Sequence, residues 1–242
     1  MNPDAVPEWE IAQHARIDPH HKGTLMSDVI LGAQDGIVNI LGVVLGVSAA
    51  SGSARLAIAA ALAAAFAESI SMAGVAYTSS MAAGDVYRSE RAREYRHVSA
   101  VPTLEREEIR ALYARKGFEG ELLDRVVETI TSNPDVWVAV MMSEEHGLVP
   151  IARRRALRSG AVVGISAITG SLLPIVPFAF LGFDVAQGAA VVVAAATLFA
   201  IGANKARKTI GHPCKAGLEI AAIGLISALA GWGIGLLFRN AG

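Results

Sequence analysis

The chain has 242 residues, of which 53% are hydrophobic, and its formal net charge at pH 7 is −1. A mean hydropathy of +0.45 is typical of an integral membrane protein and argues against an ordinary water-soluble domain. We therefore expect a lipid bilayer, and no nucleic acid, among the partners of this protein.

Charged residues are distributed unevenly along the chain. From Asp85 to Arg158 acidic and basic residues are dense and nearly balanced, whereas the stretch from Ser159 to Asn204 contains a single charge, Asp184. This pattern predicts one separate polar unit inserted between apolar segments.

The N-terminal 26 residues form a polar tail without the apolar core of a signal peptide. Its adjacent pair His20 and His21 could touch a metal, although histidines in a polar tail are more often solvated. The single cysteine, Cys214, excludes an intrachain disulfide. Together these features fit a bacterial inner membrane.

The first apolar segment extends from about Ser27 to Ala50 and carries Asp35 about two turns in. Its glycines occur as two pairs four residues apart, a spacing that lets membrane helices approach closely. We expect at least one of these faces to pack on another helix, from this chain or from a symmetry mate.

The second segment begins near Arg55, and no helix breaker precedes Asp85, so its helix can continue beyond the membrane as a stalk. A carboxylate, Glu68, lies in the middle of the apolar run, where an unpaired charge costs at least about 2.5 kcal/mol. Met72 follows one turn later on the same stripe. The stripe suits a borderline divalent transition metal; alternatively, Glu68 makes a helix–helix hydrogen bond and Met72 faces lipid.

The polar insertion predicts three short helices. The first starts near Pro102 and stops near Gly117, the second covers Glu119 to Thr131, and the third begins at Pro134 with Asn133 as its cap and ends near Leu148.

Three more apolar segments follow, at about 156–183, 185–203 and 216–238. Pro174 and Pro177 should kink or break the first of these. Basic residues gather in the polar insertion and in the loop from Lys205 to Lys215, which predicts that both are cytoplasmic. The result is five spans with the N-terminus inside, and the odd count favours a pathway on the axis of a homodimer.

Three pairs of side chains in the polar insertion could bind metal. Glu94 and His97 are spaced i,i+3, Glu105 and Glu108 are spaced i,i+3, and Met141 and Glu145 are spaced i,i+4. If the three faces converge, their ligands suit Fe²⁺, Mn²⁺ or Zn²⁺. The alternative is that the acidic faces are solvated and Met141 belongs to the core.

Enzymatic activity is not expected. Glu94 and His97 match the Glu-x-x-His element of di-iron bundles, but that element should occur twice and no second copy is suitably placed. The polar insertion also has no glycine-rich phosphate loop and no nucleophile with a positioned base. We expect no prosthetic group, and treat the metal ion as a substrate.

Four stretches taken in order resemble the vacuolar iron transporter family of ferrous iron and manganese transporters: SDVILGAQDGIVN, ESISMAGVAY, NPDVWVAVMMSEEHGL and GSLLPIVPF. The resemblance implies a five-span homodimer, a cytoplasmic metal-collecting domain, and proton-coupled antiport that removes Fe²⁺ from the cytosol. By residue matching it implies a membrane site that contains Asp35 and Met72. It also implies a cytoplasmic metal site that contains Glu94, Glu105, Glu108, Met141 and Glu145.

Two positions depart from the family pattern. His97 stands where an acid is usual, and the acid of the second span is Glu68, where Ala64 would be expected to be acidic. A shift of four residues leaves the acid on roughly the same face of the helix. We therefore expect the membrane site to be present but at a different depth. The histidine can change the metal preference or the pH at which the domain loads.

The expected fold is all-α, an integral membrane protein with five transmembrane helices and a cytoplasmic three-helix domain between spans two and three. Its parts are a tail at 1–26, spans one and two at 27–84, the metal-binding domain at 85–155 and spans three to five at 156–242. The expected function is proton-coupled export or sequestration of Fe²⁺, or Mn²⁺, through Asp35, Glu68 and Met72. The alternative is a membrane-anchored iron-binding or sensing protein without transport.

Overall fold

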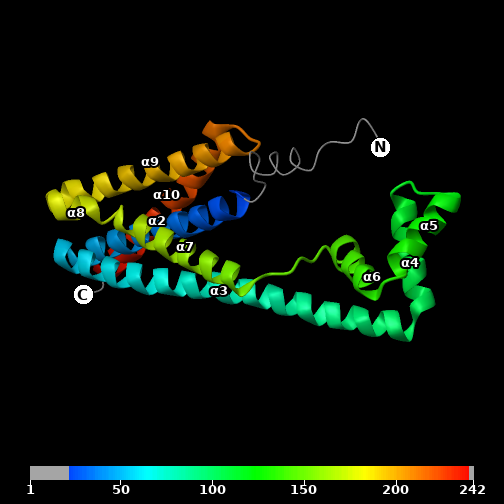
Figure 1. The fold of residues 1–242 in the computed structure, drawn as a ribbon. Coiled ribbons are helices and arrows are strands. Elements are labelled where there is room, and N and C mark those ends of the chain that lie inside the picture. Colours follow the sequence, from blue (N-terminus) through cyan, green and yellow to red (C-terminus); the bar gives the residue numbers. More distant parts are fainter. Residues whose placement is uncertain (1–21, 240–242) are drawn as a thin grey trace, which may run out of the picture. The chain divides into compact units, whose positions relative to one another are not determined.

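The computed structural model describes residues 22–239, and all of its regular elements are helices (Figure 1). Residues 1–21, with most of the predicted tail and both of its adjacent histidines, lie outside the described part of the chain. The helices are α2 (Lys22–Ser51), α3 (Ala54–Ala100), α4 (Pro102–Arg115), α5 (Gly120–Thr131), α6 (Pro134–Val140), η1 (Met141–Glu145), α7 (Arg153–Leu172), α8 (Val176–Phe180), α9 (Phe183–Lys208) and α10 (Pro213–Arg239).

The chain divides into two compact units. Of the described residues, the apolar unit comprises 22–76 and 158–239, and the polar unit is Tyr77–Leu157. Helix α3 is one helix of 47 residues that contributes to both units. Its continuity confirms the prediction that no helix breaker precedes Asp85, because no proline or capping sequence interrupts the helix before Ala100.

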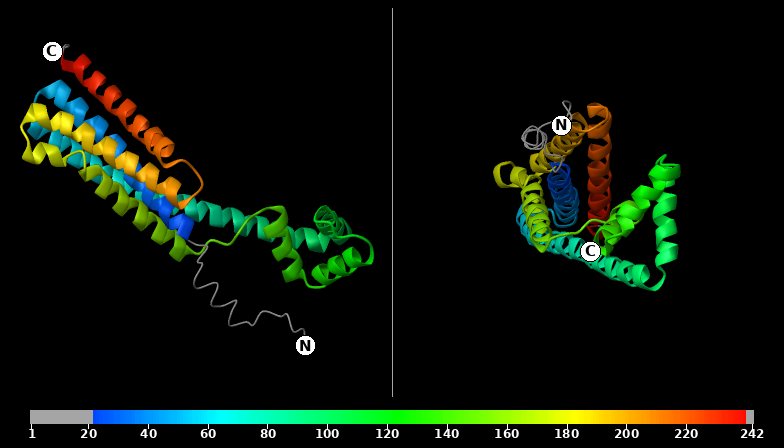
Figure 2. Two further views of the ribbon diagram at one scale, coloured as in Figure 1. Left: turned by 90° about the horizontal axis from the view of Figure 1, so that it is seen from above. Right: turned by 45° about the vertical axis from the view of Figure 1, so that its right-hand side comes forward.

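Helix α2 packs closely on two other helices of the same chain within the apolar unit (Figure 2). A Cβ atom added at Gly36 would lie 2.3 Å from the carbonyl oxygen of Ala167 in α7, and one added at Gly46 would lie 2.8 Å from that of Gly231 in α10. Both glycine faces are therefore occupied inside the chain, so the predicted close packing needs no symmetry mate.

Four of the described helices are long and apolar enough to cross a bilayer, and they are α2, α3, α9 and α10. The predicted third span is not among them, so the count of five is not confirmed. Helix α7 ends at Leu172, a turn follows, and α8 resumes at Val176, as the two nearby prolines predict. Because its uncharged part starts only after Arg158, α7 alone falls short of the roughly 20 apolar residues that a span needs.

The polar unit contains the three predicted helices, α4, α5 and α6. Asn133 caps α6, its side chain accepting a hydrogen bond from the backbone of Asp135 at 2.9 Å. After α4 the chain turns at Gly117, whose φ of +92° favours glycine. The third helix is shorter than expected, because after Val140 the chain widens into the π-helix η1.

Candidate metal centre

A group of acidic and imidazole side chains gathers in the polar unit from three of its elements. Helix α3 contributes Glu94 and His97, α4 contributes Glu105, η1 contributes Glu145, and the residue that ends η1 is His146. The three helix faces singled out in the sequence thus come from elements of the same compact unit, whose apolar core is formed by α3 to η1.

Glu94 lies at the centre of this group. Glu94 is only 3% exposed. Its Oε1 atom lies 3.2 Å from Nε2 of His146 and 4.0 Å from Nδ1 of His97. His97 Nδ1 in turn lies 3.4 Å from Oε1 of Glu105. One buried carboxylate therefore faces two imidazoles, and a second buried carboxylate faces one of them.

Glu105 is also 3% exposed, and its Oε2 atom has no hydrogen-bond partner among the described residues. Burial raises the pKa of this carboxyl, and the negative charges of Glu108 and Glu94 raise it further, while His97 partly offsets them. A buried carboxylate oxygen without a partner costs about 1–3 kcal/mol or more. A cation bound beside Glu105 would remove that cost.

Glu108 and Glu145 belong to the same electrostatic environment. Partial desolvation and the charge of Glu108 raise the pKa of Glu145, while the imidazole of His146 lowers it. Glu94 acts on the pKa values of both Glu105 and Glu145. The carboxylates are therefore close enough to repel one another, which favours a bound cation.

Met141 lies in the apolar core of the polar unit and is 1% exposed, in a cluster with Ile109 and Trp137. The core position is the alternative that the sequence analysis left open for this residue. A thioether ligand role for Met141 stays a prediction.

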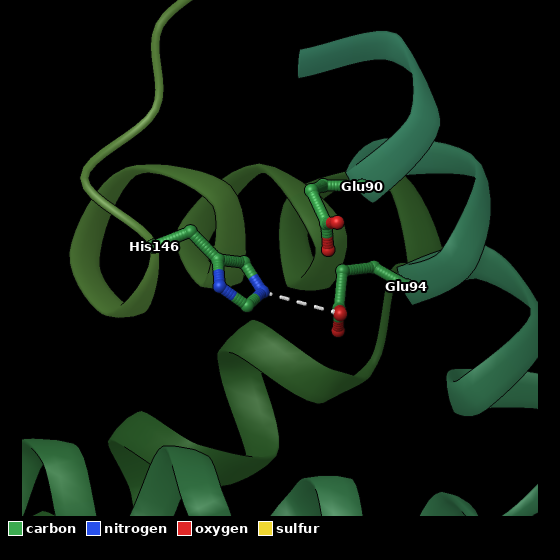
Figure 3. Close-up of side chains that lie close together, drawn as sticks. All are labelled: Glu90, Glu94 and His146. Carbon is green, nitrogen blue, oxygen red and sulfur yellow. Dashed lines mark hydrogen bonds and ion pairs between the residues drawn. The ribbon is translucent and has the colours of Figure 1, made fainter. Parts of the chain in front are cut away.

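Two residues of the cluster were not found from the sequence. Glu90, Glu94 and His146 place ligand atoms within 4.8 Å of one another (Figure 3). Glu94, His97 and Glu105 form a second such group. Glu90 could have been found, because it precedes Glu94 by four residues on α3. His146 could not have been found in this way. In the π-helix its backbone N–H donates to the carbonyl oxygen of Met141, five residues back, so its side chain lies on a different face from the one that α-helical spacing predicts.

A second polar group lies in the apolar unit, where α2 faces α3. The side-chain nitrogen of Asn39 donates a hydrogen bond to Oε1 of Glu68 at 2.7 Å, and Asp35 is a further neighbour of the Glu68 carboxyl. Glu68 therefore does make a helix–helix hydrogen bond, with a second carboxyl beside it. Met72 lies one turn further along α3 and is half-buried.

Comparison with known proteins identifies relatives along nearly the whole chain. Residues 26–236 match the model of the VIT family. Vacuolar iron transporter 2 of Oryza sativa subsp. japonica is 31% identical over 231 residues, which cover 93% of this chain and 94% of that protein. Vacuolar iron transporter 1 of Eucalyptus grandis is 30% identical, covering 96% and 94%, and the vacuolar iron transporter of Plasmodium falciparum (isolate 3D7) is 27% identical, covering 89% and 82%. By the length of the match and the identity to these relatives, the chain belongs to the VIT family.

Proposed function

We propose that this protein is a proton-coupled antiporter that removes Fe²⁺, or Mn²⁺, from the cytosol by export or sequestration. Its family membership and the names of its relatives support metal transport. The observation that carries the finer proposal is the meeting of two carboxyl groups, Asp35 and Glu68, on two helices that are long and apolar enough to span a bilayer.

Paired carboxyls suit the coupling of metal to protons. A divalent cation and protons compete for the same oxygens, so loading metal releases protons and loading protons releases metal. Asn39 orients one oxygen of Glu68, which supports a defined position for the ion near Asp35. In this proposal Met72 adds a thioether that favours a borderline transition metal over Ca²⁺ or Mg²⁺.

The polar unit then acts as the collector of metal on the cytoplasmic side. The unpaired buried oxygen of Glu105 and the two imidazoles around Glu94 support this role. Ligands proposed for the collected ion are those predicted from the sequence, which are Glu94, His97, Glu105, Glu108, Met141 and Glu145.

We also propose that the functional assembly is a homodimer in a bacterial inner membrane. The apolar unit exposes large side chains such as Ile70, Trp232 and Phe238, which lipid and a second copy would cover. In solution this would be measured as two chains per particle by light scattering in detergent.

Flux measurements in proteoliposomes test the proposal. Fe²⁺ uptake should rise with an imposed pH gradient and should move protons in the opposite direction, as reported by an internal pH dye. Glu68→Gln should abolish the gradient-dependent part, because the amide cannot exchange a proton. Glu219→Gln is the matched control, since Glu219 is the exposed acid of another apolar helix, α10, and should leave flux unchanged.

Two outcomes would contradict the proposal. Unaltered coupled flux in Glu68→Gln would remove Glu68 from the mechanism. Metal bound to the outer surface without flux, with or without a gradient, would favour a membrane-anchored binding or sensing protein instead.

A further inference from the structure

We propose that Glu90, Glu94 and His146 bind a second divalent transition-metal ion in the polar unit, beside the ion held by Glu94, His97 and Glu105. Glu94 is shared between the two positions. The inference rests on the proposed role of the polar unit as a metal collector, and it adds a position that includes two residues outside the set predicted from the sequence.

The geometry of the three side chains supports one ion. Glu90 and Glu94 are one turn apart on α3, so their carboxylates lie on the same face, and His146 reaches that face from the end of η1 (Figure 3). His146 Nε2 and Glu94 Oε1 are 3.2 Å apart. Two ligands each about 2.1 Å from a zinc-like ion in tetrahedral geometry would be separated by about 3.4 Å, so this distance suits a shared ion.

The surroundings of Glu94 supply a second reason. Oε1 of the buried Glu94 faces two imidazoles, His146 and His97, and beyond His97 lies Glu105 with a buried oxygen that has no hydrogen-bond partner among the described residues. A carboxylate has two oxygens and can bridge two ions. Two ions would be ligated by both imidazoles, and the ion beside His97 would also contact the unpaired oxygen of Glu105. A single ion at either position would leave the three residues of the other position without a cation.

Arg93 is the group that balances this charge in the absence of metal. Its Nη2 atom lies 2.5 Å from Oε2 of Glu90, and its Nε atom lies 4.0 Å from Oε1 of Glu94. Its side chain is 46% exposed, so it can turn into solvent when an ion occupies the carboxylates. We therefore expect metal binding and the Arg93 ion pair to exclude each other.

The ligand types define the class of metal. One imidazole with two carboxylates suits Fe²⁺, Co²⁺ or Zn²⁺, whereas Mg²⁺ and Ca²⁺ prefer sites made of oxygen alone. Because each of the two positions contains one histidine, both should select the same class of ion.

The test is the number of Co²⁺ ions bound per full-length chain in detergent after removal of metal by chelation. Equilibrium dialysis with elemental analysis gives the stoichiometry, and the visible absorption of Co²⁺ reports the coordination number and geometry of the bound ions. His146→Ala and Glu90→Gln should each lose one ion per chain relative to the unmodified protein, and Glu94→Gln should lose two.

Matched controls separate specific loss from misfolding. His212→Ala and Glu128→Gln change exposed residues of the same types and should keep the full stoichiometry. If His146→Ala fails to give a folded protein by gel filtration, His146→Gln preserves most of the side-chain volume and serves in its place.

Unchanged stoichiometry and absorption in both His146→Ala and Glu90→Gln would overturn the inference and leave the His146–Glu94 contact as a hydrogen bond. The proposed transport function fails separately, through absence of flux in proteoliposomes. A chain that binds both ions without flux would retain the inference while losing the transport proposal, so the two failures are distinguishable.

Discussion

Glu105 is a carboxylate that the metal-free polar unit accommodates poorly. It is 3% exposed and keeps one oxygen unpaired among the described residues, while neighbouring carboxylates add repulsion. Groups arranged in this way are expected at sites where a ligand completes the local electrostatics, at a cost to stability when the ligand is absent.

Glu105→Gln should therefore stabilise the metal-free protein. The pKa of Glu105 is raised in the folded state, so its favourable contribution exists below its ordinary pKa of about 4.3 and is lost as the pH rises through the raised value. We expect the substitution to add about 1–3 kcal/mol to the free energy of local opening at pH 7.5 and much less near pH 4.5. Hydrogen exchange of α4 amides after chelation measures this difference.

Addition of Zn²⁺ should reverse the order of the two proteins, because the variant lacks a ligand of one of the two proposed ion positions and is stabilised less by the metal. Glu128→Gln, at an exposed position of α5, is the control and should change neither pH dependence nor metal response. A Glu105→Gln protein that is less stable than the unmodified chain without metal would show that Glu105 has an unrecognised partner.

At the scale of the element, α2 is held by backbone contact with two neighbours. Its glycines approach α7 on one side and α10 on the other, and the residues that line these contacts leave no space for side chains. Close helix approach of this kind depends on dispersion contacts over the whole interface, so a single added methyl group must separate the helices.

Gly235→Ala should destabilise the apolar unit, because its Cβ would lie 2.1 Å from the carbonyl oxygen of Gly46. We expect a loss of about 1–3 kcal/mol, seen as a lower melting temperature in detergent. Gly233→Ala, two residues earlier in the same helix, meets nothing within 4 Å and should be neutral or slightly stabilising. Equal effects of the two substitutions would show that the contact with Gly46 does not govern stability.

The π-helix η1 is the element that sets the direction of His146. Deletion of the exposed Ser143 would shorten the five-residue hydrogen-bonded turn to the four-residue turn of an α-helix. The backbone N–H of His146 would still bond to the oxygen of Met141, so the imidazole would keep its direction toward Glu94. We expect full Co²⁺ stoichiometry with unchanged helix content by circular dichroism. Loss of one bound Co²⁺ per chain in the deletion protein would mean that the wide turn itself is needed for binding.

At the scale of the whole molecule, the number of membrane crossings depends on the segment of α7 and α8. With the N-terminus on the cytoplasmic side, as predicted, a crossing by this segment places the basic loop between α9 and α10 in the cytoplasm, where its lysines and arginines predict it to be. If it does not cross, that loop lies on the opposite side, because the number of crossings before it changes by one. The loop therefore reports the count of spans.

Cys214 gives a direct measurement of this topology. It is the only cysteine of the chain, and it is exposed at the start of α10. A membrane-impermeant maleimide should label it in inverted membrane vesicles and leave it unlabelled in intact cells. The converse control is Ser51→Cys in a Cys214→Ser background, which should be labelled from outside, since Ser51 ends α2 and is exposed. Labelling of Cys214 in intact cells would show that α7 and α8 do not complete a span.

Local features of the sequence were enough to predict most of the helices. Apolar runs of about 20 residues, the cap at Asn133 and the prolines at 174 and 177 act through the chain's own backbone and hydrophobicity, so they are readable without tertiary contacts. The same holds for the Glu94–His97 pair on α3 and the Glu105–Glu108 pair on α4, because i,i+3 spacing places both members of a pair on one face of a helix.

Contacts between distant segments were decided only in the folded chain. The π-helix that turns His146 toward Glu94 breaks the 3.6-residue periodicity on which sequence reasoning depends, and the hydrogen bond from Asn39 to Glu68 joins residues of two separate helices. Periodicity specifies the face of a helix, but the partner of that face depends on how helices pack. For this reason the family and its helices could be predicted from the sequence, while the shared position of Glu94 between two imidazoles required the tertiary structure.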